Sequence, residues 1–66
     1  MQITLNGTLR EVAKEITVTE LLGEIGLRPQ QVAVEVNREL VPRSRHQSHV
    51  LQTGDRVEIV TLVGGG

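Results

Sequence analysis

The sequence predicts a small α+β domain in which one helix lies across one face of a mixed β-sheet. Five short apolar segments have the composition of strands, and several alternate apolar with polar residues. One further segment carries apolar residues at helical spacing. The chain has 66 residues and no Phe, Tyr or Trp, so it can hold one small core built from aliphatic side chains.

The first strand and the turn after it are predicted from residues 2–6 (Q-I-T-L-N). Ile3 and Leu5 fall on one face, which is the pattern of a strand with one buried side. Asn6 and Gly7 follow. This pair is a strong hairpin signal because both residues tolerate the positive φ angles of a type I′ turn.

The second strand is expected over residues 8–14. Its apolar positions are Leu9 and Val12, which are three residues apart. Because strict alternation requires an even spacing, this strand is expected to bulge near Arg10 and Glu11.

A helix start is predicted at Thr17. The Thr17 hydroxyl can accept a hydrogen bond from the N–H of Glu20, and the Glu20 carboxylate can accept one from the N–H of Thr17. Ile16, just before this capping box, is placed to pack against Leu21.

The helix itself is predicted from a stripe of apolar residues at i, i+3, i+4 and i+7, namely Val18, Leu21, Leu22 and Ile25. Gly26 is expected as the left-handed residue that ends it, and Pro29 prevents its continuation. Gly23 weakens the helix by about 1 kcal/mol relative to Ala, so packing against the sheet must hold it in place.

Three further strands are expected in the second half of the chain, at residues 32–37, 40–41 and 57–63. The polar segment between them, residues 43–49, is expected to be an exposed loop. Val50 and Leu51 are expected to return to the core.

The predicted order is strand, strand, helix, strand, short strand, strand. Two strands before the helix and the rest after it favour a β-grasp, or ubiquitin-like, fold with a four- to five-stranded mixed sheet. In this fold the first and last strands run parallel at the centre of the sheet, so both must be apolar. The segments M-Q-I-T-L and V-E-I-V-T-L-V meet that requirement. We therefore expect a β-grasp domain at residues 1–63 and a flexible glycine tail at residues 64–66.

Composition excludes several classes of function. The chain has no Cys, which excludes disulfides and a cysteine nucleophile and is typical of a reducing compartment. Its formal net charge is −1, and without a basic excess or aromatic side chains nucleic-acid binding is not expected. No membrane span or signal peptide is apparent, and Met1 opens directly into a strand, so we expect a complete cytoplasmic chain.

Candidate catalytic and metal-binding groups are few. His46 and His49 are three apart, but no further ligands have a suitable spacing, so we interpret both as solvated loop residues with no metal. The carboxylate pairs Glu11 with Glu15 and Glu20 with Glu24 are interpreted as solvent-exposed, because so small a chain leaves little volume for a pocket.

The hydroxyls of Thr17, Ser44 and Ser48 lack the sequence context of a nucleophile, and no phosphate-binding glycine loop is present. No catalytic residue is therefore predicted, and the chain is not expected to be an enzyme.

The last three residues, Gly64, Gly65 and Gly66, carry the functional prediction. Glycines have no Cβ, so this tail can enter a narrow channel in a partner where any side chain would clash. The reactive group that this arrangement indicates is the terminal carboxylate of Gly66.

Over essentially its whole length the sequence resembles the ThiS family, the sulfur-carrier proteins of thiamine biosynthesis. The resemblance rests on M-Q-I-T-L-N-G, T-V-T-E-L-L, V-N-R-E-L-V-P-R-S, L-Q-T-G-D-R-V-E-I-V and the terminal G-G. Diglycine ends also mark ubiquitin and its relatives. The length, V-P-R, G-D-x-V and the diglycine end together distinguish this family.

The resemblance implies the chemistry at the tail. An E1-like enzyme of the ThiF type adenylates Gly66 using ATP, and sulfur from a desulfurase-derived persulfide displaces AMP to give a thiocarboxylate. Thiazole synthase of the ThiG type then takes the sulfur. By resemblance Gly65 and Gly66 are the functional pair and Gly64 extends the tether, while the carrier itself binds no cofactor.

A docking patch beside the tail is also predicted. If Val57 and Ile59 face the helix, the outward positions Glu58, Val60 and Leu62, followed by Val63, form a partly apolar surface for a partner. The alternative is that a neighbouring strand partly covers Val60 and Leu62.

Arg38 takes a turn position where many relatives of the family have Gly or Asn, which leaves the type of that turn open.

Three other functions remain compatible with the sequence. The small subunit of molybdopterin synthase has the same fold and thiocarboxylate, but those chains tend to be longer and richer in aromatic residues. A ubiquitin-like interaction module that is never activated would leave the diglycine end unexplained. A third reading, a modifier conjugated to other proteins, predicts isopeptide-linked adducts.

Overall fold

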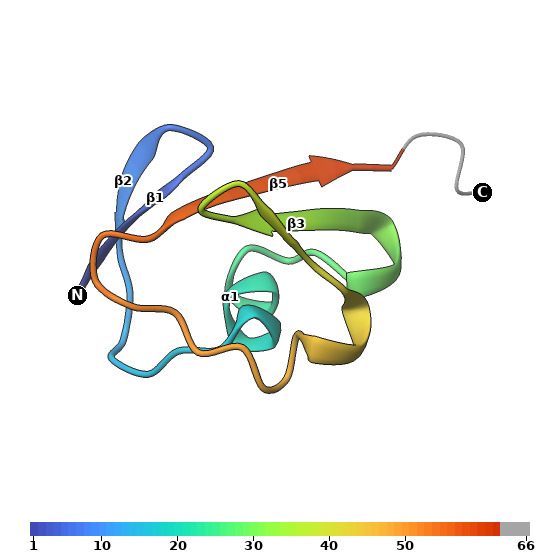
Figure 1. The fold of residues 1–66 in the computed structure, drawn as a ribbon, viewed down its shortest axis with the longest axis horizontal. Helices are drawn as coiled ribbons and strands as arrows, with labels where there is room; N and C mark the ends of the chain where they lie inside the picture. The colour runs from blue at the N-terminus through green and yellow to red at the C-terminus, as the bar shows by residue number, and fades with distance from the viewer. Residues whose placement is uncertain (63–66) are drawn as a thin grey trace.

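The computed structural model describes residues 1–62, which form one sheet with one α-helix packed on one of its faces (Figure 1). The elements in chain order are β1 (Gln2–Leu5), β2 (Thr8–Glu11), α1 (Val18–Glu24), a 3-10 turn (Pro29–Gln31), β3 (Val32–Val36), β4 (Glu39–Val41), a second 3-10 turn (Arg43–Arg45) and β5 (Arg56–Thr61).

The sheet has the strand order β2-β1-β5-β3-β4, with β5 at its centre. β5 runs parallel to β1 on one side and antiparallel to β3 on the other. Figure 1 shows α1 beneath β3 and β5, and no other helix or strand of residues 1–62 covers the opposite face of these strands. The predicted β-grasp fold, with parallel first and last strands, is confirmed.

The turn between β1 and β2 has the geometry that the sequence predicts. Asn6 and Gly7 have φ angles of 50° and 82°, both in the left-handed region that a type I′ turn requires. Their hairpin pairs in continuous register from Gln2 opposite Glu11 to Leu5 opposite Thr8.

The prediction for the second strand was wrong in three respects. β2 ends at Glu11 instead of residue 14, and its register contains no bulge. Leu9 lies opposite Thr4 and is 67% exposed, whereas Arg10 lies opposite Ile3 on the helix side. Arg10 can occupy that position because its long stem carries the guanidinium to the Glu24 carboxylate, 3.6 Å away.

The predicted capping box at the start of α1 is confirmed. The Thr17 hydroxyl accepts from the Glu20 N–H (3.1 Å), and the Glu20 carboxylate accepts from the Thr17 N–H (2.9 Å). The two N–H groups that precede Glu20 in the helix donate to loop carbonyls, Val18 to His49 (3.1 Å) and Thr19 to His46 (3.0 Å). The backbone N–H groups of residues 17–20, which have no partner within the helix, therefore all form hydrogen bonds.

The end of α1 forms a Schellman motif. Leu27 N–H donates to the Leu22 carbonyl (3.0 Å) and Gly26 N–H donates to the Gly23 carbonyl (3.3 Å). Gly26 has φ +74°, as predicted for the residue that ends this helix. Ile25 is the C-cap and lies only partly buried against the core.

The second hairpin joins β3 to β4 through Asn37 and Arg38, with φ angles of 52° and 70°. Both lie in the left-handed region, so the turn left open by the sequence is of the same kind as the Asn6-Gly7 turn. Glycine and asparagine adopt this region readily, whereas Arg38 is strained there.

The segment that returns to β5 departs from the sequence prediction at Val50. Leu51 is buried as expected, but Val50 is 47% exposed. Val50 forms an isolated antiparallel bridge with Thr17, and Leu51 N–H donates to the Ile16 carbonyl (2.8 Å). Because neighbours in an extended segment point to opposite sides, burying Leu51 turns Val50 outward.

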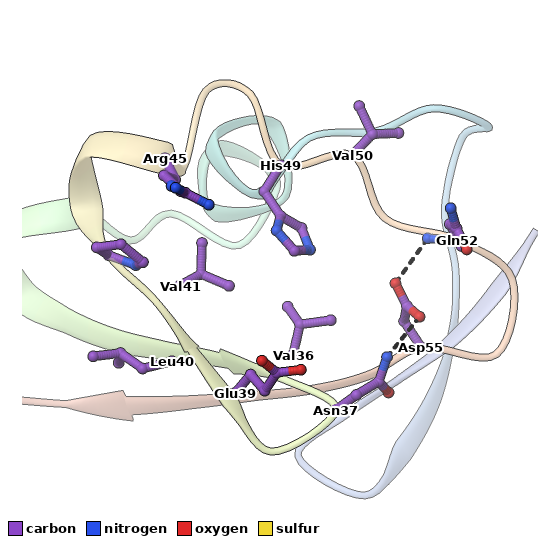
Figure 2. A pocket seen from close by; sticks show the side chains of 11 residues that line it. Val36, Asn37, Glu39, Leu40, Val41, Arg45, His49, Val50, Gln52 and Asp55 are labelled. Carbon is purple, nitrogen blue, oxygen red and sulfur yellow. Dashed lines mark hydrogen bonds between the residues drawn. The ribbon is translucent and has the colours of Figure 1, made fainter.

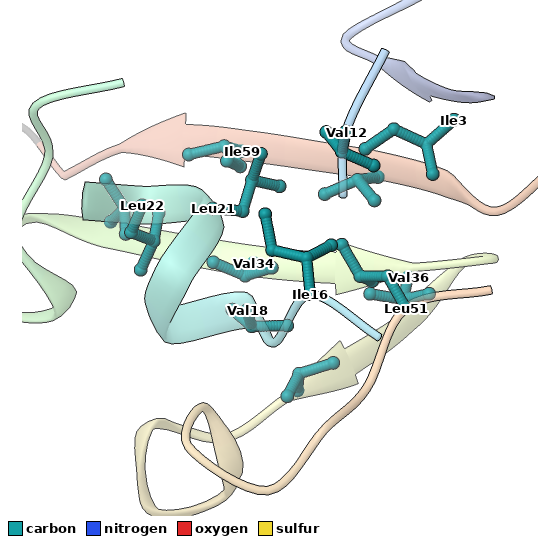
Figure 3. Packing of buried hydrophobic residues seen from close by; sticks show 13 residues of the cluster. Ile3, Val12, Ile16, Val18, Leu21, Leu22, Val34, Val36, Leu51 and Ile59 are labelled. Carbon is teal, nitrogen blue, oxygen red and sulfur yellow. The ribbon is translucent and has the colours of Figure 1, made fainter. Parts of the chain in front are cut away.

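The core is one aliphatic cluster between α1 and the inner face of the sheet (Figure 3). Ile16 and Leu21, which were predicted to meet at the helix start, are both members of it. Its thirteen residues are Ile3, Val12, Ile16, Val18, Leu21, Leu22, Val32, Val34, Val36, Val41, Leu51, Val57 and Ile59.

Candidate functional site

The central strand β5 separates a buried face from an exposed one, as its sequence predicts. Val57 and Ile59 are buried against the helix side. Glu58 and Val60 point the other way and are exposed, and Leu62 beyond the strand is 50% exposed. The 61% exposure of Val60 shows that no neighbouring strand in residues 1–62 covers it.

Two asparagine side chains fix β5 from its two sides. The Asn6 amide accepts from the Ile59 N–H (2.8 Å) and donates to the Ile59 carbonyl (3.3 Å), which continues the ladder beyond the last pair of β1. The Asn37 amide accepts from the Arg56 N–H (2.9 Å) and donates to the Asp55 carboxylate (3.0 Å). The strand that leads to the tail is thus held by both turns.

The end of β5 is attached to the sheet on the β3 side. Thr61 pairs with Val32, and Leu62 N–H donates to the Gln31 carbonyl (2.7 Å). The strand ends two residues earlier than residue 63, the end predicted from the sequence.

The predicted tail, Gly64, Gly65 and Gly66, and the predicted docking residue Val63 lie outside the described residues, which are residues 1–62. The role assigned to Gly66 and the boundary between domain and tail therefore stay predictions. The structure brings together the other three predicted docking residues, Glu58, Val60 and Leu62, along one strand and its extension.

The prediction that His46 is solvated was wrong. Its side chain is buried (2% exposed), and its Nε2–H donates to the Val41 carbonyl at 3.0 Å, while Nδ1 has no hydrogen-bond partner. The surrounding segment contains a 3-10 turn, so it is not a simple exposed loop. His46 is therefore a structural residue that ties this turn to β4.

Three of the four carboxylates considered as catalytic pairs have structural partners, and the fourth, Glu15, is exposed. Glu11 lies 3.1 Å from the terminal ammonium of Met1, and Glu24 pairs with Arg10. Glu20 serves the helix cap. Within residues 1–62 no group of three His, Cys, Asp or Glu side chains could hold a metal ion.

A groove of about 370 Å³ lies between β4 and the segment that leads to β5 (Figure 2). His49, Arg45 and Glu39 line it, and the Asp55 carboxylate in its wall accepts from the Asn37 amide and from the Gln52 N–H (2.8 Å). The expectation that so small a chain leaves little volume for a pocket was wrong here, because the walls of this groove come from segments far apart in the chain. Its charges are mixed, and they define no reaction.

No helix in the described part of the chain is long and apolar enough to cross a membrane.

In residues 1–62, the strand order, the one α-helix and the parallel pairing of β1 with β5 define a β-grasp protein, and its sequence ends in three glycines. Comparison with known proteins narrows this class. Residues 3–66 match the model of the ThiS family. The chain belongs to that family.

Individual relatives agree with this assignment. The sulfur carrier protein ThiS of Escherichia coli is 33% identical, and the match covers 100% of both chains. A crystal structure of the thiamine biosynthesis protein ThiS from Geobacter metallireducens superposes with a TM-score of 0.86 at 35% identity and full coverage of both chains.

Longer proteins also contain a matching region. A thiazole synthase of Paramagnetospirillum magneticum is 42% identical and one of Magnetococcus marinus is 39% identical over 66 residues. The chain spans 20% of the length of these two relatives.

Proposed function

We propose that this chain is a sulfur carrier of thiamine biosynthesis and that the Gly66 carboxylate holds the sulfur. The observation that carries the proposal is the match to the sulfur carrier of Escherichia coli over the whole of both chains. The family match also extends to Gly66. The fold supports this role, because hydrogen bonds hold the chain to the sheet as far as Leu62, and the glycines begin two residues later in the sequence.

The proposed chemistry begins with activation of a poor electrophile. A carboxylate oxygen of Gly66 attacks the α-phosphorus of ATP, which forms an acyl-adenylate and releases pyrophosphate. A persulfide sulfur then attacks the acyl carbon, and AMP leaves with the electron pair of the C–O bond. The resulting acyl disulfide is cleaved by a second thiol, which forms a disulfide with the donor and leaves a thiocarboxylate on Gly66.

This chemistry requires three partners. An E1-like enzyme of the ThiF type would bind ATP and adenylate the tail, and a cysteine desulfurase would supply the persulfide sulfur. A thiazole synthase of the ThiG type would accept the sulfur, and the similarity to two longer thiazole synthases supports this partner. The carrier itself would bind no cofactor and act in the cytoplasm as a co-substrate, with Gly64, Gly65 and Gly66 entering the partners' active sites.

Docking would involve the folded domain as well as the tail. We propose that Glu58, Val60, Leu62 and Val63 belong to the surface that the partners contact. The exposure of Val60 and Leu62 supports this part of the proposal, because two large aliphatic side chains are exposed shortly before the tail in the sequence.

The test is ATP–pyrophosphate exchange catalysed by a ThiF-type enzyme in the presence of this chain. We expect exchange with the natural chain and its loss when one Ala is added after Gly66, because the carboxylate is then displaced by about 3.5 Å and carries a side chain next to it. Exchange that is absent with the natural chain, or unchanged by the added Ala, would contradict the proposal.

A further inference from the structure

The outer sheet face consists of the residues of β3, β4 and β5 that point away from α1, together with Leu62. It combines exposed aliphatic side chains with two carboxylates. Leu40 and Val60 are more than 60% exposed, and Leu62 is half exposed. Its members are Ala33, Glu35, Leu40, Arg56, Glu58, Val60 and Leu62.

The two carboxylates lie directly opposite one another at the centre of this face. Glu35 on β3 pairs in register with Glu58 on β5, and both are exposed. Cβ atoms of such cross-strand pairs are about 4.5–5.5 Å apart, and like charges in this arrangement destabilise the sheet. The fold therefore contains a repulsion in the middle of its open face.

No group in residues 1–62 forms an ion pair with either carboxylate. The nearest cation along the strand is Arg56, two residues before Glu58 on the same face, and it pairs with neither. Apolar side chains adjoin the two acids instead, with Leu40 opposite Glu35 on β4 and the Val60–Ala33 pair in the next row.

We propose that this face docks the adenylating partner and that Glu35 and Glu58 together bind a Lys or Arg side chain of that partner. This inference rests on the proposed function. A cation between the two carboxylates would be attracted to both of them and would offset their mutual repulsion. The aliphatic side chains around them would exclude water, which strengthens the attraction relative to an exposed ion pair.

The length of the chain after Leu62 supports the assignment of this face to a partner that also binds the tail. Gly66 follows Leu62 by four residues, so it lies within about 14 Å of Leu62 in any conformation. An enzyme that holds the Gly66 carboxylate therefore lies within reach of this end of the face. A second copy of the chain is a poor occupant, because two such faces packed together would bring four carboxylates close to one another.

The test measures KM for the carrier in pyrophosphate exchange by a ThiF-type enzyme at low ionic strength. For the double variant Glu35→Gln with Glu58→Gln we expect KM to rise about tenfold with kcat nearly unchanged. The matched control is Glu15→Gln, which removes an exposed, unpaired carboxylate elsewhere and should leave KM unchanged. The effect should shrink as salt is added.

A single variant separates docking from folding. Glu35→Lys converts the repulsion with Glu58 into an attraction, so the melting temperature should rise while KM also rises more than tenfold. Weaker binding by a more stable protein cannot be explained by misfolding.

The outcomes distinguish this inference from the proposed function. Absence of exchange with the natural chain would contradict the proposed function itself. Normal exchange with an unchanged or lower KM in both variants would overturn the role of the acidic pair. Normal adenylation kinetics combined with slowed sulfur transfer to a thiazole synthase would overturn the assignment to the adenylating partner.

Discussion

The side chain of Asn6 offers a sharp test of how β5 is held. Asn6→Gly keeps the turn, because glycine adopts φ 50° without strain, but it removes both hydrogen bonds to the Ile59 backbone. Each bond contributes about 1 kcal/mol net, so the free energy of unfolding should fall by about 2 kcal/mol. A domain of this size has about 3–10 kcal/mol in total, and the melting temperature should therefore fall by about 8–16 °C.

Urea unfolding followed by far-UV circular dichroism is the suitable assay, because the chain has no Trp or Tyr for fluorescence. The comparison variant is Asn37→Gly. It also removes two side-chain hydrogen bonds from a left-handed turn position, but those bonds are exposed and water can replace them. A loss below about 0.5 kcal/mol for Asn6→Gly, or one no larger than that of Asn37→Gly, would refute this account of β5.

Three further substitutions test local features by their effect on the urea midpoint. Arg38→Gly should stabilise the fold by about 1 kcal/mol, because it relieves a left-handed φ of 70°, and a lower midpoint would contradict this explanation. Thr17→Ala should cost about 1 kcal/mol through loss of the helix cap, whereas Thr17→Ser should be close to neutral. Gly23→Ala should stabilise the fold by about 0.5–1 kcal/mol, because the added Cβ would meet no atom within 4 Å. A destabilised variant would show that the added methyl group does not fit at this position.

Features that depend on neighbours in sequence could be predicted well. The turn at Asn6-Gly7 and the capping box at Thr17 rest on interactions within a few residues, and both are confirmed. The two faces of β5 follow from alternation alone. The β-grasp fold followed from the order of these elements.

Features that depend on distant segments could not be predicted in the same way. Leu9 is exposed because the register with β1 places Arg10 on the inner face, and sequence spacing does not determine that register. The burial of His46 depends on two other segments. Its ring donates to the Val41 carbonyl, and its own carbonyl accepts from the Thr19 N–H at the start of α1. The pairing of Glu35 with Glu58 appears only when β3 and β5 are aligned.

Some of the proposed docking residues could be predicted from neighbours in the sequence, and one could not. Glu58, Val60 and Leu62 lie near one another in sequence, and their exposure could be predicted from the strand pattern. Leu40 joins the same face through the sheet, so its contribution required the structure.

The central claim is that Gly66 carries sulfur as a thiocarboxylate. Its most direct test is the intact mass of the chain after incubation with a ThiF-type enzyme, ATP, a cysteine desulfurase, cysteine and a thiol, followed by fragmentation of the intact ion. We predict replacement of one oxygen by sulfur, dependent on ATP, with the change confined to the fragment that contains Gly66. An unchanged mass with partners that modify the Escherichia coli sulfur carrier under the same conditions, or sulfur on any other residue, would contradict it.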